Sequence, residues 1–196
     1  MASTNALLAL ETFRGKGIRF IDKTQAMRLF GLESANTAYK FLQRLEKRGV
    51  IKRVTVGIYV LASDNVEDFE VANAAVSPSY VSLESALSYY GVLSQFPYEI
   101  TSITTKRSRK FTFGKEFEYT HINKELYWGF VKNNKFVIAT AEKALLDMLY
   151  LATKGLRKLD IDELDISSLD KDLLRRYCQK FNIAAITKIL EGKKVI

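Results

Sequence analysis

The sequence predicts an α+β protein, with an N-terminal winged helix-turn-helix followed by a C-terminal domain of helices packed on a mostly antiparallel sheet. Hydrophobic residues recur at helical spacing, alternate as in strands after Pro97, and then return to helical spacing. The polar segment 63–65 stands where the composition changes, so we expect a winged-helix domain at 1–62 and an α+β domain at 63–196. The 196 residues, 47% of them hydrophobic, are enough for two small globular domains.

The first elements are predicted from spacing and capping residues. Residues 4–13 have the spacing of an amphipathic helix, and residues 18–21 alternate as a short strand does. Asp22 and Gln25 fit the capping box of a second helix, which Gly31 would end. This second helix is the first half of the predicted helix-turn-helix.

A third helix is predicted to begin after its N-cap Ser34 and to end at Gly49. Two strands, 50–54 and 58–61, follow it and would form the wing. One side of the helix is apolar at helical spacing and should be buried, and it consists of Ala38, Phe41, Leu42 and Leu45.

The opposite side of this third helix carries amides, hydroxyls and cations without an acid, at Asn36, Thr37, Tyr39, Lys40, Gln43, Arg44 and Lys47. Such a helix fits the major groove of duplex DNA. We expect contacts to base edges and nearby phosphates from Asn36, Thr37, Tyr39 and Lys40, with Gln43 on the same face. We expect the DNA backbone to be held by Arg44, Lys47, Arg48, Lys52 and Arg53. The alternative is a basic, solvated helix packed on its own domain.

Positive charge is concentrated at the N-terminal end of the chain. Residues 1–62 contain 11 Lys or Arg and four Asp or Glu, whereas residues 63–196 contain 19 and 18. A requirement for solubility alone would spread the charge along the chain. The distribution therefore places the attraction to a polyanion in the predicted winged helix.

The C-terminal region opens with two predicted helices, one at 67–75 and one capped by Ser82 and ended by Gly91. Alternating apolar residues then predict strands at 99–105, 110–113, 116–122, 125–131 and 135–138. Together these segments indicate an antiparallel sheet of four or five strands.

Three further helices are expected after the sheet. Thr140 caps the first, in which Lys143 and Asp147 are spaced as an i,i+4 pair. An acidic loop separates it from helices at 171–181 and 184–191.

Few residues suggest catalysis. His121 is the only histidine and Cys178 the only cysteine, and the sequence contains neither a phosphate-binding glycine loop nor a G-x-S-x-G turn. The acidic run Asp160, Asp162 and Asp165 resembles a metal-binding run, but it is read as a solvated connection that also caps the next helix. The helical acids Glu84, Glu142 and Asp147 could form a set of active-site carboxylates, but this interpretation is the less favoured one. We expect no enzyme activity, no catalytic residues, no metal site and no cofactor.

A second basic run comprises Lys106, Arg107, Arg109 and Lys110 and falls at a predicted hairpin tip. It is read either as a solvated turn or as a second contact to a polyanion, such as flanking DNA backbone or RNA. The aromatic residues of the neighbouring strands alternate, so they are expected to pack in the core rather than stack on bases.

The segments PSYVSLESALSYYGVL and VIATAEKALLDMLYL, together with the basic N-terminal region, resemble the AbiEi-type antitoxins of bacterial abortive-infection (type IV) toxin–antitoxin systems. This resemblance covers nearly the whole chain. It implies a repressor that binds inverted repeats in its own operon's promoter. It also implies an antitoxin domain that counters a nucleotidyltransferase toxin without requiring a stable complex.

The expected partners are therefore operator DNA and that toxin. An N-terminus without the features of a signal peptide and the lack of a long apolar run predict a cytoplasmic protein that does not bind membranes. No heptad seam is present, so we expect a monomer that pairs on DNA. Two alternatives remain: a winged-helix regulator whose C-terminal domain senses a small effector, and an enzyme that acts on nucleic acid.

Overall fold

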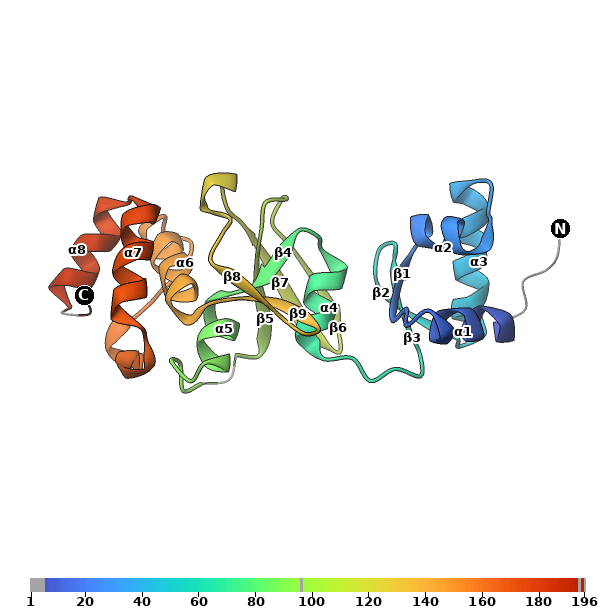
Figure 1. Cartoon of the computed structure of the whole chain (residues 1–196), viewed down its shortest axis with the longest axis horizontal. Coiled ribbons are helices and arrows are strands. Elements are labelled where there is room, and N and C mark those ends of the chain that lie inside the picture. Colours follow the sequence, from blue (N-terminus) through green and yellow to red (C-terminus); the bar gives the residue numbers. More distant parts are fainter. Residues whose placement is uncertain (1–5, 96, 194, 196) are drawn as a thin grey trace. The chain divides into compact units, whose positions relative to one another are not determined.

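The computed structural model describes residues 6–95, 97–193 and 195, and the chain divides into two compact units (Figure 1). Unit 1 is Met1–Glu67 and unit 2 is Asp68–Ile196. Helices account for 47% and strands for 22% of the structure, which confirms the predicted α+β class. None of the described helices has the length and apolar character of a membrane span.

Unit 1 combines three helices with a small sheet. Its elements are α1 (Ala6–Gly15), β1 (Phe20–Asp22), α2 (Lys23–Phe30), α3 (Ala35–Lys47), β2 (Ile51–Thr55) and β3 (Ile58–Leu61). The strands are antiparallel in the order β1-β3-β2. The predicted start of the first helix, at Thr4, lies outside the described residues.

The predicted helix caps in unit 1 are present. The Asp22 carboxylate accepts from the Gln25 backbone N–H at 2.8 Å, and the Gln25 side chain accepts from the Asp22 N–H at 3.0 Å. Gly31 ends α2 with φ of 60°, in the left-handed region that glycine adopts without strain. The Ser34 hydroxyl accepts from the Thr37 N–H at 3.1 Å and so caps α3. These local features set where α2 begins and ends and where α3 begins.

Unit 2 is built on a six-stranded mixed sheet in the order β6-β7-β5-β4-β9-β8. The strands are β4 (Ser79–Val81), β5 (Glu99–Thr104), β6 (Arg109–Phe113), β7 (Lys115–His121), β8 (Phe130–Asn133) and β9 (Phe136–Ala139). Three strand pairings are antiparallel, while β5–β7 and β4–β9 are parallel. The sheet is therefore not the simple antiparallel arrangement that the alternating segments suggested.

Two helices, α4 (Asp68–Ala75) and α5 (Leu83–Tyr89), cover the sheet, and α6 (Ala141–Thr153) packs on α5 and β9. Helices α7 (Lys171–Phe181) and α8 (Ala184–Gly192) pack against α6. Tyr119 on β7 donates to the carbonyl of Ala72 in α4 at 2.7 Å, whereas Thr101 on β5 bonds the N–H of Ser85 in α5. Ser102, the register partner of Tyr119, shares its face, and the adjacent Thr101 points the other way. Helices α4 and α5 therefore lie on opposite faces.

The predicted strands of this unit differ from the observed ones at two further places. The expected strand 125–131 is instead a 3₁₀ turn at Lys124–Leu126 followed by β8, because Trp128 turns away to pack edge-on against Tyr177 of α7 at 5.0 Å. Strand β4 was not expected. It has only three residues and all are buried, so it lacks the alternation that marks a strand exposed on one side.

Candidate nucleic-acid interface

Helix α3 is sharply divided between a buried and an exposed side. Ala38, Phe41, Leu42 and Leu45 are at most 2% exposed, as predicted. Phe41 lies 4.8 Å from Phe30 of α2, measured between ring centroids, and this contact helps to join the two helices. Burial of this stripe fixes the rotation of α3 and directs the polar side chains outward.

The outward side of α3 contains a hollow of about 440 Å³. Its lining consists of six of the ten residues predicted to bind DNA, namely Asn36, Thr37, Lys40, Gln43, Arg44 and Lys47. These positions recur every three or four residues, so they lie along one face of the helix. No acidic residue lines the hollow, and three of its six side chains are cations.

The cations of this face are not neutralised within the described part of the chain. Lys40, Arg44 and Lys47 are exposed, and the ion pairs found among the described residues involve other side chains. The Thr37 hydroxyl lies 2.9 Å from the Ser34 hydroxyl and so takes part in the helix cap. Among the described residues, neither the amides of Asn36 and Gln43 nor the cations of this face have a side-chain partner, so the face offers two amides beside three unpaired positive charges.

The other four predicted residues do not line the hollow. Tyr39 is 46% exposed, and Arg48, the C-cap of α3, is exposed as well. Lys52 and Arg53 are exposed neighbours on β2, at the edge of the small sheet. The β2–β3 turn also presents Val56, 83% exposed, which the sequence reasoning did not select. Its exposure could have been predicted from sequence, because Val56 is a β-branched residue between Thr55 and Gly57 in the turn that joins the two predicted strands.

The second basic run has a different setting from the one predicted. It does not form a hairpin tip, since β5 and β6 are separated by β7, and the hairpin is the β6–β7 pair around Gly114. Lys106, Arg107 and Arg109 are exposed. Lys110 instead lies among three carboxylates, with its Nζ 3.0 Å from Glu99, 3.2 Å from Glu116 and 3.6 Å from Glu118.

Sequence reasoning missed a buried polar cluster in unit 2. Lys143 and Asp147 of α6 form an ion pair in which both side chains are 0% exposed. The Asp147 carboxylate also accepts from the hydroxyls of Ser82 at 2.8 Å and Tyr80 at 3.0 Å. Burial lowers the pKa of Lys143 and raises that of Asp147, while their mutual attraction opposes both shifts. The i,i+4 spacing was noted, but no local signal distinguished it from a surface pair.

Three aromatic rings surround the Lys143 ammonium. Its Nζ lies 5.4 Å from the ring centroid of Tyr80, 5.3 Å from that of Trp128 and 5.2 Å from that of Phe181. These separations are typical of cation–π contacts. The cluster therefore joins α6 to β4, to the turn before β8 and to α7.

The alternative carboxylate set is not brought together. Glu84 lies 3.7 Å from the guanidinium of Arg157, Glu142 accepts from the backbone N–H of Asp170 at 3.0 Å, and Asp147 belongs to the buried cluster. Among the residues that the structure describes, no group of three or more His, Cys, Asp or Glu side chains could hold a metal ion. Each acid thus has a separate structural partner.

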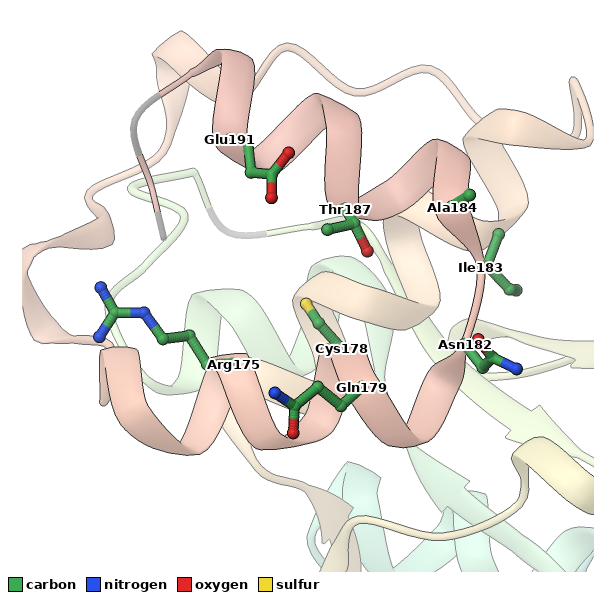
Figure 2. A pocket seen from close by; sticks show the side chains of 8 residues that line it. All are labelled: Arg175, Cys178, Gln179, Asn182, Ile183, Ala184, Thr187 and Glu191. Atoms are coloured by element: carbon green, nitrogen blue, oxygen red, sulfur yellow. The ribbon is translucent and has the colours of Figure 1, made fainter.

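Unit 2 also contains a hollow of about 390 Å³ between α7 and α8 (Figure 2). Cys178 and Thr187 face each other across it, Arg175 and Glu191 stand at its open end, and Asn182 lies at the turn between the helices. Burial raises the pKa of the Cys178 thiol, so the thiol is held in its neutral form. The lining mixes one cation, one acid and uncharged groups.

Comparison with known proteins gave no match, either to a protein-family model or to a curated protein sequence.

Proposed function

We propose that unit 1 is a winged helix that binds duplex DNA through α3, and that the protein is a transcriptional repressor. In this proposal α2 and α3 form the helix-turn-helix and the β2–β3 hairpin is the wing. The observation that carries it is the hollow along α3, which six polar or cationic side chains line without any acid. A helix about 10–12 Å across, with such a face, matches the width of the major groove.

The chemistry of the face assigns roles to its members. The amides of Asn36 and Gln43 can each bond an adenine edge through two hydrogen bonds, which gives sequence preference. Lys40, Arg44 and Lys47 attract phosphates, which gives affinity that falls as salt rises. Arg48 at the end of α3 and Lys52 and Arg53 on β2 continue the positive charge onto the wing.

The resemblance to AbiEi-type antitoxins extends the proposal to both units. The operator would consist of inverted repeats in the protein's own promoter, bound by two copies of a chain that is a monomer in solution. Unit 2 would counter a nucleotidyltransferase toxin encoded beside it. Support for this second role comes from the two motifs of unit 2, PSYVSLESALSYYGVL and VIATAEKALLDMLYL.

The DNA-binding proposal is tested with the variant Lys40→Ala/Arg44→Ala on a duplex from upstream of the gene. We expect the variant to lose promoter binding, measured by fluorescence anisotropy, while its thermal unfolding matches that of the wild type. The control Arg14→Ala/Lys16→Ala removes the same charge from exposed positions of unit 1 outside the hollow. Equal affinities of the α3 variant and the control would refute the proposal.

The antitoxin role is tested separately, by co-expression with a neighbouring nucleotidyltransferase gene. The wild type and the α3 variant should both restore growth, because the proposed antitoxin function resides in unit 2. A truncated chain that lacks unit 2 should not restore growth. Failure of the wild type to restore growth would exclude the antitoxin role without affecting the DNA-binding proposal.

A second candidate is a winged-helix regulator that senses a small effector, and the hollow between α7 and α8 favours it (Figure 2). Its volume of about 390 Å³ is within the range of small-molecule sites. Arg175, which pairs with Asp172 at 3.0 Å, and Glu191 put one cation and one acid in the lining, which would suit a ligand that carries both charges. Release of promoter DNA by a metabolite, abolished by Cys178→Leu, would favour this candidate over the antitoxin.

A further inference from the structure

A second group of exposed cations lies in unit 2, where β5 and β7 end and β6 begins. The backbone N–H of Ile122 donates to the carbonyl of Thr104 at 2.9 Å, which brings the segments 105–109 and 122–125 together. These segments contain four Lys or Arg and a single acid, Glu125. We call Lys106, Arg107 and Arg109 the loop cations. Unlike the α3 face, this group lies on the connection from β5 to β6 and on the first residue of β6.

Strand geometry separates the loop cations from the last member of the basic run. Adjacent residues of β6 point to opposite faces, so Arg109 and Lys110 diverge. Lys110 meets the three glutamates of its own face, and its hydrogen bond to Glu99 leads the causes that raise its pKa. None of the loop cations forms an ion pair with a described residue. Three of the four charges in the run are thus available to a ligand.

The segment that carries the loop cations is held in place by hydrogen bonds. The His121 ring Nδ1 lies 3.1 Å from the carbonyl of Lys106, and the His121 N–H donates to the Ser108 hydroxyl at 2.9 Å. The Thr104 hydroxyl accepts from the Lys106 N–H at 3.1 Å and donates to the carbonyl of Pro78 at 2.6 Å. A fixed loop loses less conformational entropy on binding than a free one does.

We propose that the loop cations form a second DNA contact, to the sugar-phosphate backbone of the duplex that α3 reads. This inference rests on the proposed DNA-binding function of unit 1. The nearby aromatic rings are already engaged, since Phe111 stacks on Phe117 at 5.0 Å and Tyr119 is 1% exposed. Single-strand binding uses exposed aromatics on which bases stack, so a duplex is the favoured ligand.

The second contact adds affinity without adding sequence preference. No Asn or Gln side chain stands among the loop cations to bond a base edge as α3 does. Their contacts to phosphates do not depend on the base sequence. Because the two units belong to one chain, binding of DNA by α3 raises the local concentration of DNA phosphates near the loop cations. The affinity of the whole protein should then exceed that of unit 1, with a steeper dependence on salt.

The test uses the full-length variant Lys106→Ala/Arg107→Ala/Arg109→Ala on promoter duplex, with anisotropy measured over a range of salt concentrations. We expect affinity to fall roughly tenfold at low salt and the slope of log K against log salt to fall by about two to three. The loss should be equal for promoter and shuffled duplexes. Thermal unfolding and Trp128 fluorescence, from the only tryptophan in the chain, verify that the fold is retained.

Two control variants isolate the contact from the overall charge. Lys158→Ala/Arg176→Ala/Lys188→Ala removes three exposed cations elsewhere in unit 2 and should leave the affinity within about twofold, because distant charges are screened by salt. Lys106→Arg/Arg107→Lys/Arg109→Lys keeps the charge and should bind like the wild type. Equal losses in the loop variant and the charge-matched control would overturn the inference.

The outcomes also distinguish this inference from the function on which it rests. Loss of binding in the Lys40→Ala/Arg44→Ala variant, with none in the loop variant, overturns only the second contact. Unchanged binding in the α3 variant overturns the proposed function itself. A loop variant that loses affinity for single-stranded but not for duplex DNA would refute the choice of ligand.

Discussion

The ammonium of Lys143 and the carboxylate of Asp147, one turn apart on α6, form an ion pair from which solvent is fully excluded. The pair survives burial because neither charge lacks partners. Ser82 and Tyr80 donate to the carboxylate, and three aromatic rings face the ammonium. Ser82 occupies the N-cap position of α5, but its hydroxyl serves Asp147 rather than the helix end. The sequence prediction that Ser82 caps the helix is thus correct in position only.

Removing one member of the buried pair should destabilise unit 2 strongly. Lys143→Met leaves an uncompensated carboxylate in the core and should lower the free energy of unfolding by about 3–5 kcal/mol. The double variant Lys143→Met/Asp147→Leu should cost less than the sum of the single variants, since no charge is stranded. Urea denaturation followed by Trp128 fluorescence measures the free energy of unfolding of the two single variants, Lys143→Met and Asp147→Leu, and of the double variant. Strict additivity would show that the two side chains do not interact.

The packing of Gly129 against the buried lysine gives a second prediction. A Cβ at Gly129 would lie 2.9 Å from Cγ of Lys143, and the residue has φ of +76°. Gly129→Ala should therefore destabilise the fold by about 1–3 kcal/mol. Gly155→Ala is the matched control, because its φ is +70° but the space around it is open. Equal losses of unfolding free energy in the two variants would mean that the Lys143 side chain moves aside for the added methyl group without strain.

Stability should depend on pH through Glu118. Burial acts to raise the pKa of this carboxyl, but Arg157, 2.6 Å away, and Lys110 outweigh it and hold the pKa below its usual value of 4.5. A lowered folded pKa contributes stability that is present above the unfolded pKa of 4.5 and is lost as pH falls through the folded pKa. The stability advantage of the wild type over Glu118→Gln should accordingly be larger at pH 7 than at pH 3. Guanidinium denaturation at both pH values measures it.

Two single substitutions on α3 should separate sequence preference from affinity. Asn36→Ala should reduce discrimination between promoter and shuffled duplex by about 1–3 kcal/mol, because an amide can bond a base edge through two hydrogen bonds. Lys47→Ala should weaken binding to both duplexes alike and reduce the salt slope by about one. Competition titrations with the two duplexes measure both effects. The assignment of Asn36 would fail if its variant lost affinity for both duplexes equally.

Much of unit 1 could be predicted from sequence, because its signals are local. The Asp22–Gln25 capping box, the end of α2 at Gly31 and the buried stripe of α3 depend on residues within four positions of one another. The rotation of α3 follows from that stripe, so the exposure of Lys40 and Arg44 followed as well. Helical periodicity alone was enough to predict that Lys40 and Arg44 lie on one face of α3, where they line the same hollow.

In unit 2 the sequence by itself determined where most helices and strands lie, but not how they meet. Strand β4 and the parallel β5–β7 pairing depend on neighbours far away in the chain, so no local pattern announces them. The surroundings of Lys143 were likewise decided by tertiary structure, since Tyr80 is 63 residues away and Phe181 reaches it only once α7 has docked. A lysine and an aspartate at i,i+4 spacing have the same sequence pattern on a solvent-exposed helix and on a buried one. Only packing separates the two cases, because only packing removes the water.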